Sequence, residues 1–303
     1  MKTILDILNE SGVAFRENEP LSRHTSFRIG GPARFFAEPS SRDEIVFLLR
    51  ELRENDLPYF VMGNGSNLLA RDEGFEGLVI MLGEKFARIT NDGCSITAEA
   101  GALMSKIART ALELELTGFE FAHGIPGSFG GGVFMNAGAY GGELKDIVTE
   151  VEYIDEDLKI KTCSGSEANF VYRGSQFKDN RALVVLSARI GLQKGSRAEI
   201  EEKMRDLAAR RRDKQPLEFP SAGSTFKRPE GYFAAKLIED CGLKGFSVGG
   251  AQVSEKHSGF VINTGGATFA DVYELTEQVK TKVMEQYGVE LEREVEIMKP
   301  FVK

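Results

Sequence analysis

The chain has 303 residues, enough for two domains of ordinary size, and its acidic residues outnumber its basic residues by 46 to 38. The resulting net charge of −8 argues against nucleic acid as a partner, because phosphate backbones are bound by clusters of Lys and Arg. With 42% hydrophobic and 28% charged residues, the composition is that of a globular protein, which excludes a disordered or collagen-like chain.

The first two thirds of the chain alternate short β-rich runs with helical segments. Apolar residues at 45, 48, 49 and 52 predict a helix over 43–54. Those at 103, 107, 111 and 114 predict a second helix over 103–116, which Gly118 ends. Runs of β-forming residues bounded by Gly or polar turn residues predict strands over 33–38, 58–62, 78–82, 95–100, 148–154, 159–163 and 182–192.

A change in composition near 193–196 marks the expected domain boundary, which divides a first domain, 20–193, from a second, 194–303. Ser196 and Glu199 form a capping-box pattern at the start of a helix that ends in a basic run. A helix over 233–241 and a strand over 260–264 follow, and Gly242 separates them. We therefore expect an α+β protein of two domains.

The last part of the sequence predicts a long helix and a final strand. Thr268 is the expected N-cap of the helix, Asp271 lies in its first turn, and Gly288 ends it. The strand, 291–298, alternates apolar residues on one face with three acids on the other, Glu292, Glu294 and Glu296.

The sequence carries no signal for secretion, membrane insertion or a metal centre. Its N-terminal apolar stretch is interrupted by Asp6 and Asn9, and no run of 18 apolar residues predicts a membrane helix. Cys94, Cys163 and Cys241 are widely spaced, and the three histidines form no HxxxH or HExxH pattern. We expect a cytoplasmic protein with reduced thiols, no metal and no membrane partner.

Two glycine-rich segments give the first functional signal. Residues 63–67, Gly-Asn-Gly-Ser-Asn, follow a predicted strand, and their backbone N–H groups can converge on an anion. Taken alone, this segment indicates phosphate binding and a structural turn about equally, because it lacks the P-loop and Rossmann endings. Residues 124–142 hold eight glycines, which favours close approach of backbone to a flat or diphosphate-bearing ligand. Together the segments favour a dinucleotide cofactor.

Six short blocks, in order along 20–298, resemble the UDP-N-acetylenolpyruvoylglucosamine reductase family. They include HTSFRIGG from 24, GNGSNLL from 63, YRGS from 172, AGSTFK from 222 and EREVEI from 292, together with the glycines of 124–141. The resemblance implies an FAD-binding domain of the vanillyl-alcohol-oxidase (PCMH) type with two α/β lobes, followed by a C-terminal α+β substrate-binding domain. It also implies NADPH-dependent reduction of UDP-N-acetylglucosamine enolpyruvate to UDP-N-acetylmuramate in peptidoglycan biosynthesis.

The resemblance further implies three catalytic residues: Arg173, the proton donor Ser224, and Glu294. Hydride delivered to an enolpyruvyl group leaves an enolate-like species, whose oxygens a permanently charged guanidinium can hold bidentately. Glu294 would help only as a neutral acid that donates a hydrogen bond, and burial together with substrate charge would raise its pKa towards that form. Ser224 is a weak acid, but the carbanion it would protonate is a strong base.

The glycine segments and the resemblance together predict the ligand-binding residues. For the sugar nucleotide we expect Lys227 and Arg228, three and four positions after Ser224. For FAD we expect backbone and short side chains from both segments: Gly63, Asn64, Gly65, Ser66, Asn67, Gly124, Ile125, Pro126, Gly127, Ser128, Gly130, Gly131, Asn136, Ala137 and Gly138.

Read without the family blocks, the same residues have plainer interpretations. On that basis the favoured interpretation of Arg173 is an exposed strand arginine, that of Ser224 a turn or cap serine, and that of Glu294 one of three acids on a solvated face. The basic run 210–214 reads as a solvated helix end, with attraction of the sugar nucleotide's diphosphate as a secondary role. His257 reads as a surface or loop residue.

The spacing of the catalytic blocks indicates a subtype. Arg173 and Ser224 stand only 51 positions apart, and no Tyr lies between Tyr172 and Tyr232. The chain therefore resembles the shorter members of the family, which lack an inserted loop whose tyrosine closes over the substrate. We expect a monomer. Two other functions stay open, a different FAD oxidoreductase on the same scaffold and a non-catalytic nucleotide-binding protein.

Overall fold

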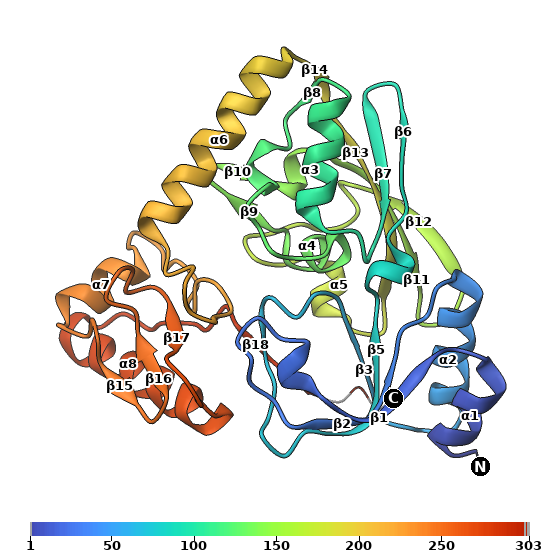
Figure 1. The fold of residues 1–303 in the computed structure, drawn as a ribbon, viewed down its shortest axis with the longest axis horizontal. Coiled ribbons are helices and arrows are strands. Elements are labelled where there is room, and N and C mark those ends of the chain that lie inside the picture. The colour runs from blue at the N-terminus through green and yellow to red at the C-terminus, as the bar shows by residue number, and fades with distance from the viewer. Residues whose placement is uncertain (1, 300, 302–303) are drawn as a thin grey trace.

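The computed structural model describes residues 2–299 and 301, and Figure 1 shows three parts that meet near the centre of the molecule. The first part is a four-stranded sheet in the order β1-β2-β5-β3, with two helices packed on it. Strands β2, β5 and β3 run parallel, and β1 pairs antiparallel at the edge. Its elements are α1 (Ile4–Ser11), β1 (Phe15–Pro20), β2 (Pro32–Ala37), α2 (Arg42–Glu54), β3 (Tyr59–Met62) and β5 (Phe75–Met81).

Helix α2 confirms the predicted helix over 43–54. The Ser41 side chain caps it by accepting a hydrogen bond from the backbone N–H of Glu44. Its apolar positions lie on one face and are fully buried against the sheet, Ile45, Leu48 and Leu52 among them.

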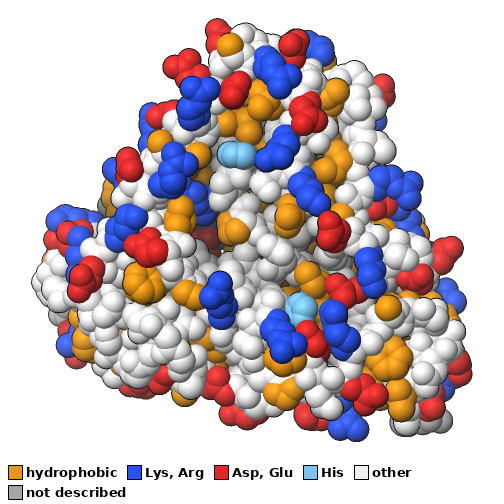
Figure 2. All heavy atoms as spheres, in the orientation of Figure 1, with side chains coloured by type: hydrophobic (Ala, Val, Ile, Leu, Met, Phe, Trp, Pro, Cys, Tyr) orange, Lys and Arg blue, Asp and Glu red, His pale blue; other side chains and the backbone are white. Residues whose placement is uncertain are grey.

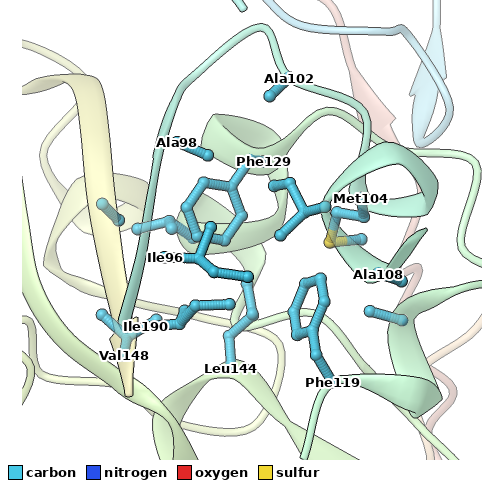
Figure 3. Packing of buried hydrophobic residues seen from close by; sticks show 14 of the residues in the cluster. Ile96, Ala98, Ala102, Met104, Ala108, Phe119, Phe129, Leu144, Val148 and Ile190 are labelled. Atoms are coloured by element: carbon cyan, nitrogen blue, oxygen red, sulfur yellow. The ribbon is translucent and has the colours of Figure 1, made fainter. Parts of the chain in front are cut away.

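The second part is a five-stranded antiparallel sheet in the order β12-β11-β13-β7-β6. Helices α3 and α4 pack on one face of it, and Figure 3 shows Phe129 of α4 between Ile96 of β7 and Met104 of α3. The bounds are β6 (Ile89–Asp92), β7 (Ser95–Glu99), α3 (Met104–Glu113), α4 (Phe129–Met135), β11 (Val148–Ile154), β12 (Ile160–Ser164), α5 (Gln176–Asp179) and β13 (Val184–Gly191). Two short pairs complete it: β8 (Leu116–Thr117) with β14 (Gln193–Lys194), and β9 (Gly138–Ala139) with β10 (Gly142–Glu143).

The third part follows a long helix, α6 (Arg197–Lys214), which Figure 1 shows running from β14 down to the C-terminal elements. These elements surround a hydrophobic core of their own. They are α7 (Ala234–Asp240), β15 (Ser247–Val248), β16 (Ala251–Val253), β17 (Val261–Asn263) and α8 (Phe269–Tyr287).

The chain then returns to the first part. There β18 (Glu296–Ile297) pairs in parallel with β4 (Leu68–Leu69), directly after the first glycine-rich segment. Helix α8 is tied to the same part, because Asp72 accepts a hydrogen bond from the Phe269 N–H at its first residue, at 2.9 Å.

Several predicted elements are confirmed with small shifts of their ends. Thr268 and Asp271 form the capping box of α8, and Gly288 ends that helix at φ 66°. The helix over 233–241 is α7, and the strand over 260–264 is β17. The mixture of helices and sheets confirms the α+β class.

Three local predictions were wrong. Helix α3 ends at Glu113, and Glu115 at φ 56° makes the left-handed turn that we assigned to Gly118. Ser196 precedes α6 but makes no side-chain capping bond, so the capping box is absent there. The strand 291–298 is only two residues long, because the chain before Glu296 is held by single contacts such as the bridge between Phe226 and Arg293.

The start of α6 packs against the second part, so the structure shows no clear domain boundary there. Ile200 and Met204 of this helix are buried in the core of that part, beneath α3. The boundary at 193–196 therefore stays a prediction. Within residues 2–299 and 301, none of the helices combines the length and the apolar character that crossing a bilayer requires.

Candidate functional site

A cavity of about 400 Å³ lies where the three parts meet. Its walls come from strand β3 and the glycine segment after it, the second glycine segment, and the segments around residues 221–224 and 294–296. Figure 2 shows that charged side chains cover the periphery of this face, while the area between the three parts is mostly backbone and uncharged side chains. This is a size and position typical of a small-molecule site.

The first glycine-rich segment forms part of this wall. Gly65 has φ 60°, and a Cβ there would overlap the carbonyl oxygen of His24, so no other residue fits. Within the described residues, the backbone N–H groups of Gly65, Ser66 and Asn67 donate to no protein acceptor, and all three residues line the cavity. Successive free N–H groups of this kind can hold an anion.

The second glycine-rich segment lies against the first. The Asn64 side chain donates to the carbonyl of Pro126 at 2.5 Å, and the Asn64 N–H donates to the Ser128 hydroxyl at 3.4 Å. The N–H groups of Phe129 and Gly130 are already used, because they donate to the carbonyls of Ala102 and Ala100. The two segments therefore make one continuous wall, to which the first contributes three successive free donors.

Much of the glycine content has a structural explanation that we did not predict. We argued that so many glycines serve a ligand, but a Cβ at Gly63 would overlap Ser128, and one at Gly130 would lie 2.6 Å from the Ala100 Cβ. Residues 129–135 form helix α4 rather than a ligand-binding loop. These glycines permit close packing of protein on protein, and that packing in turn shapes the cavity wall.

Arg173 and Glu294 form an ion pair at the cavity. The Arg173 Nε donates to Glu294 Oε1 at 2.7 Å, and both side chains are less than one-fifth exposed. Arg173 has φ 55° in the tight turn after β12, and its Nη2 also donates to the carbonyl of Gly138. A strained backbone that places a buried guanidinium in a cavity is a usual feature of functional sites.

Burial raises the pKa of Glu294 above its ordinary value, and the charges of Arg173, Lys178 and Lys227 oppose that rise. The backbone of Glu294 is held on both sides: its N–H donates to the carbonyl of Thr225, and its carbonyl accepts from the Asn67 side chain. The carboxyl is therefore fixed between the first glycine segment and the segment that carries Ser224, and burial there raises its pKa although it is paired with Arg173.

Ser224 lines the same cavity from the connection between α6 and α7. Gly223 before it has φ 78°, and the hydroxyl oxygen of the buried Thr225 after it accepts a hydrogen bond from the Val261 N–H at 2.9 Å. The serine is thus exposed beside a buried, hydrogen-bonded neighbour, Thr225. The structure brings all three predicted catalytic residues, Arg173, Ser224 and Glu294, to one cavity.

The three acids of the last segment are not a solvated face. Each is paired with a cation from another segment: Glu292 with Lys227, Glu294 with Arg173, and Glu296 with both Lys178 and Arg181. Only in Glu292 is the side chain mainly exposed, at 70%. The geometry therefore separates Glu294 and Glu296, which line the cavity, from Glu292, which does not.

Four predicted binding residues lie outside the cavity wall. Lys227 is engaged by Glu292, and the Arg228 guanidinium stacks 3.8 Å from the centre of the Phe233 ring. Asn136 is fully buried and holds the backbone through bonds to Val171 and Lys145. Gly124 lies behind the wall, against Arg211.

Arg211 and Gln215, at the end of α6, are among the residues of the wall that sequence reasoning missed. We interpreted the basic run 210–214 as solvated, but burial lowers the pKa of Arg211. A signal was present: Arg211 and Gln215 follow Met204 and Ala208 at helical spacing, on the face of α6 that packs inwards. His257, predicted on the surface, is half-buried and accepts a hydrogen bond from Gly259.

These residues fit a flavin dinucleotide. The free N–H groups of residues 65–67 suit a diphosphate, and the cavity between the three parts has room for a ring system beside Ser224 and Glu294. Within the described residues, the side-chain oxygen of Gln215 is a buried polar atom without a partner. Such an acceptor needs a partner that the described residues do not supply, and a ligand that makes the side chain turn towards the cavity is one such partner.

Comparisons with known proteins agree with this geometry. Residues 33–164 match the family model of an FAD binding domain, and residues 215–298 match that of the C-terminal domain of UDP-N-acetylenolpyruvoylglucosamine reductase.

Several relatives carry the name UDP-N-acetylenolpyruvoylglucosamine reductase. That of Caldanaerobacter subterraneus is 54% identical over 281 residues, covering 93% of this chain and 92% of its own. That of Clostridium perfringens is 50% identical over 297 residues, covering 98% and 96%. The crystal structure of the Thermus caldophilus reductase is 35% identical, has a TM-score of 0.80, and covers 95% of this chain and 99% of its own.

Proposed function

The chain belongs to the UDP-N-acetylenolpyruvoylglucosamine reductase family, and from that premise we propose how its cavity residues divide the reaction among them. The protein is an oxidoreductase with FAD as its cofactor, and it reduces the enolpyruvyl group of the UDP-sugar in peptidoglycan synthesis. When bound, FAD supplies the hydride that the enolpyruvyl double bond accepts. The remaining steps fall to the side chains of the cavity.

We propose NADPH as the source of the electrons and UDP-N-acetylmuramate as the product. NADPH and the sugar nucleotide would enter in turn, since both must approach the same reacting centre. The enzyme would act as a monomer in the cytoplasm, where nucleotide-activated sugars and NADPH are made, without nucleic acid or membrane partners. We also keep the division into an FAD-binding domain over 20–193 and a substrate-binding domain over 194–303.

Arg173 is proposed to hold the carboxylate of the enolpyruvyl group. The guanidinium pairs with Glu294 through Nε, and its Nη2 donates to the Gly138 carbonyl at 3.3 Å. A substrate carboxylate is a better bidentate partner than one oxygen of a partly buried acid. Its arrival would therefore draw Arg173 away from Glu294 and fix the acceptor double bond in the cavity.

Glu294 is proposed to become a neutral acid in the same exchange. The charge of Arg173 is the first of the influences that keep its pKa down, while burial raises it. When the substrate carboxylate pairs with the guanidinium, Arg173 no longer lowers the pKa of Glu294 as strongly. Burial and the negative charge of the substrate then both raise that pKa. A protonated Glu294 can then donate a hydrogen bond to the negative oxygens that develop as the hydride arrives.

Ser224 is proposed to donate the proton that completes the reduction. It lines the cavity from a connection separate from those of the other two residues, and its exposed hydroxyl makes no hydrogen bond within the described part of the chain. The hydroxyl is thus free to turn to the carbanion, which is a strong enough base to take its proton. Water and the substrate's own groups can restore that proton afterwards.

The observation that supports this assignment is that Arg173, Ser224 and Glu294 line one cavity. The backbone of the first glycine-rich segment lines another part of the same cavity. The test is product analysis: purified protein is incubated with NADPH and UDP-N-acetylglucosamine enolpyruvate. Mass spectrometry should find a product heavier by two hydrogens, formed in proportion to the NADPH consumed. NADPH consumption that does not depend on the sugar nucleotide would remove the proposal.

A further inference from the structure

The end of α6 carries a cationic side chain, Arg211, and an amide side chain, Gln215, that have no role in the proposed reaction. Arg211 lines the cavity, and within residues 2–299 and 301 its guanidinium makes neither an ion pair nor a hydrogen bond. A buried charge without a counterion is costly unless a ligand supplies one. Gln215, one helical turn later, lines the same wall, and its side-chain oxygen is buried without a partner.

The protein makes room for Arg211. A Cβ on Gly124 would come within 3.0 Å of the Arg211 Cδ and 3.2 Å of its Nη1, so this glycine lets the Arg211 side chain lie close to the second glycine segment. The Gln215 N–H donates to the Arg211 carbonyl at 2.9 Å, which fixes the two residues relative to each other. The pair is therefore a built feature of the wall and not a loose helix end.

The position of the pair restricts what it can contact. Arg211 lies in the last turn of α6, Gln215 directly follows that helix, and Ser224 lies nine residues further on; all three line the cavity. The flavin must present its reactive nitrogen, N5, to the substrate beside Ser224. The pyrimidine ring is fused directly to the ring that carries N5, so it lies within a few atoms of the same wall.

The chemistry of that ring matches the pair. Its edge presents the acceptors N1 and C2=O next to the donor N3–H, and reduction places negative charge on N1 and C2=O. A guanidinium satisfies the two acceptors, and a side-chain amide oxygen satisfies N3–H. If the amide is turned round, its NH2 group instead donates to a ring carbonyl, so either orientation complements this edge. A diphosphate, by contrast, offers no N–H group for the Gln215 oxygen.

We propose that Arg211 and Gln215 bind the pyrimidine edge of the flavin, with Arg211 stabilising the charge of the reduced cofactor. This inference rests on the FAD site of the proposed function. It makes Arg211 a residue that sets how readily the enzyme-bound flavin accepts electrons from NADPH, and Gln215 a residue that orients the ring.

The test is the midpoint potential of the bound flavin, measured by dye equilibration in the wild type and in variants. Arg211→Met should weaken binding of reduced relative to oxidised flavin at least tenfold, which for a two-electron couple lowers the potential by about 30 mV or more. Arg211→Lys should keep most of the wild-type potential, because it keeps the charge. Arg205→Met is the matched control: this arginine is exposed on the same helix, pairs with Glu201 and lies outside the cavity wall, so the potential should not change.

Gln215→Leu should weaken the binding of oxidised FAD several-fold, measured by flavin fluorescence, because one neutral hydrogen bond is lost. Arg211→Gln removes the charge while keeping a donor, so it supplies the same measurement if Arg211→Met does not fold. A bound flavin whose potential is the same in the Arg205 and Arg211 variants would overturn the inference.

Two further results would also overturn it. Weaker binding of oxidised FAD at an unchanged potential would mean that Arg211 serves the cofactor's diphosphate, and weaker binding of the sugar nucleotide alone would mean that it serves the substrate. A wild-type protein that binds no flavin would contradict the proposed function itself. A wild-type flavoprotein that is insensitive to Arg211 would contradict this inference only.

Discussion

The Nε of Arg173 donates to Oε1 of Glu294 at 2.7 Å, although 121 positions of sequence separate the two residues. The pair joins the turn after β12 to the last segment of the chain, across the cavity. Both side chains are mostly buried, so each neutralises the charge of the other inside the protein. An acidic substrate has to replace Glu294 as the partner of Arg173. The predictions for substrate binding and catalysis follow from that exchange.

Substrate binding should take up protons. If the carboxylate of the sugar nucleotide replaces Glu294 on Arg173, the pKa of Glu294 rises on binding, and the complex holds more protons than the free enzyme at a pH between the two values. Affinity should therefore fall as the pH rises through that interval. Calorimetric titrations in buffers of different ionisation enthalpy measure the protons exchanged, and release of protons on binding would contradict the exchange.

Glu294→Ala should lower the rate of reduction of the sugar nucleotide by about 10²–10³-fold, the usual loss when one donor to a developing negative charge is removed. Glu294→Gln should lose less, because its amide still donates a hydrogen bond. Glu292→Ala is the control, since this acid is exposed and lies outside the cavity. Equal losses in the Ala and Gln variants would show that Glu294 must transfer a proton and not merely donate a hydrogen bond.

Ser224→Ala should bind FAD and accept electrons from NADPH at the wild-type rate, but reduce the sugar nucleotide about 10²–10⁴-fold more slowly. The two half-reactions are measured separately by stopped-flow absorbance of the flavin. Ser247→Ala, in the exposed strand β15, should leave both rates unchanged. If the second half-reaction of Ser224→Ala is as fast as that of the Ser247 variant, another group donates the proton.

Gly65→Ala should lose FAD binding, and Gly93→Ala should keep it. The two glycines have nearly the same backbone, φ 60° and 58°, so the conformational strain of about 1–2 kcal/mol applies to both. Only at Gly65 would the new Cβ overlap another atom, the His24 carbonyl oxygen, while nothing lies near it at Gly93. Flavin content after purification and thermal unfolding distinguish them, and equal flavin content would contradict the structural role of the Gly63–Asn67 turn.

The sequence was sufficient to predict those helices whose structure depends mainly on residues within the helix itself. The apolar spacing of α2 and the Thr268 capping box of α8 were predictable because hydrophobic period and capping are short-range effects. Helix α4 was not, since its glycines have poor helix propensity and the helix forms because Phe129 and Val133 are buried in the core of the second part. Tertiary packing overrides propensity there.

The residues of the site could be predicted from the sequence, but the ion pairs between them could not. The family blocks pointed to Arg173, Ser224 and Glu294, which do meet at one cavity, yet nothing in the sequence joins Glu296 to Lys178 and Arg181. Such pairs depend on how distant segments are brought together. The same limit concealed Arg211, whose place in a basic run suggested solvent while the fold turns it inwards.

The most direct measurement of the central claim is the visible spectrum of the purified protein through one catalytic cycle without oxygen. The account predicts flavin absorbance that NADPH bleaches and that UDP-N-acetylglucosamine enolpyruvate then restores, one equivalent for one. A colourless protein that takes up no added FAD, or a bleached flavin whose colour the sugar nucleotide does not restore, would contradict it.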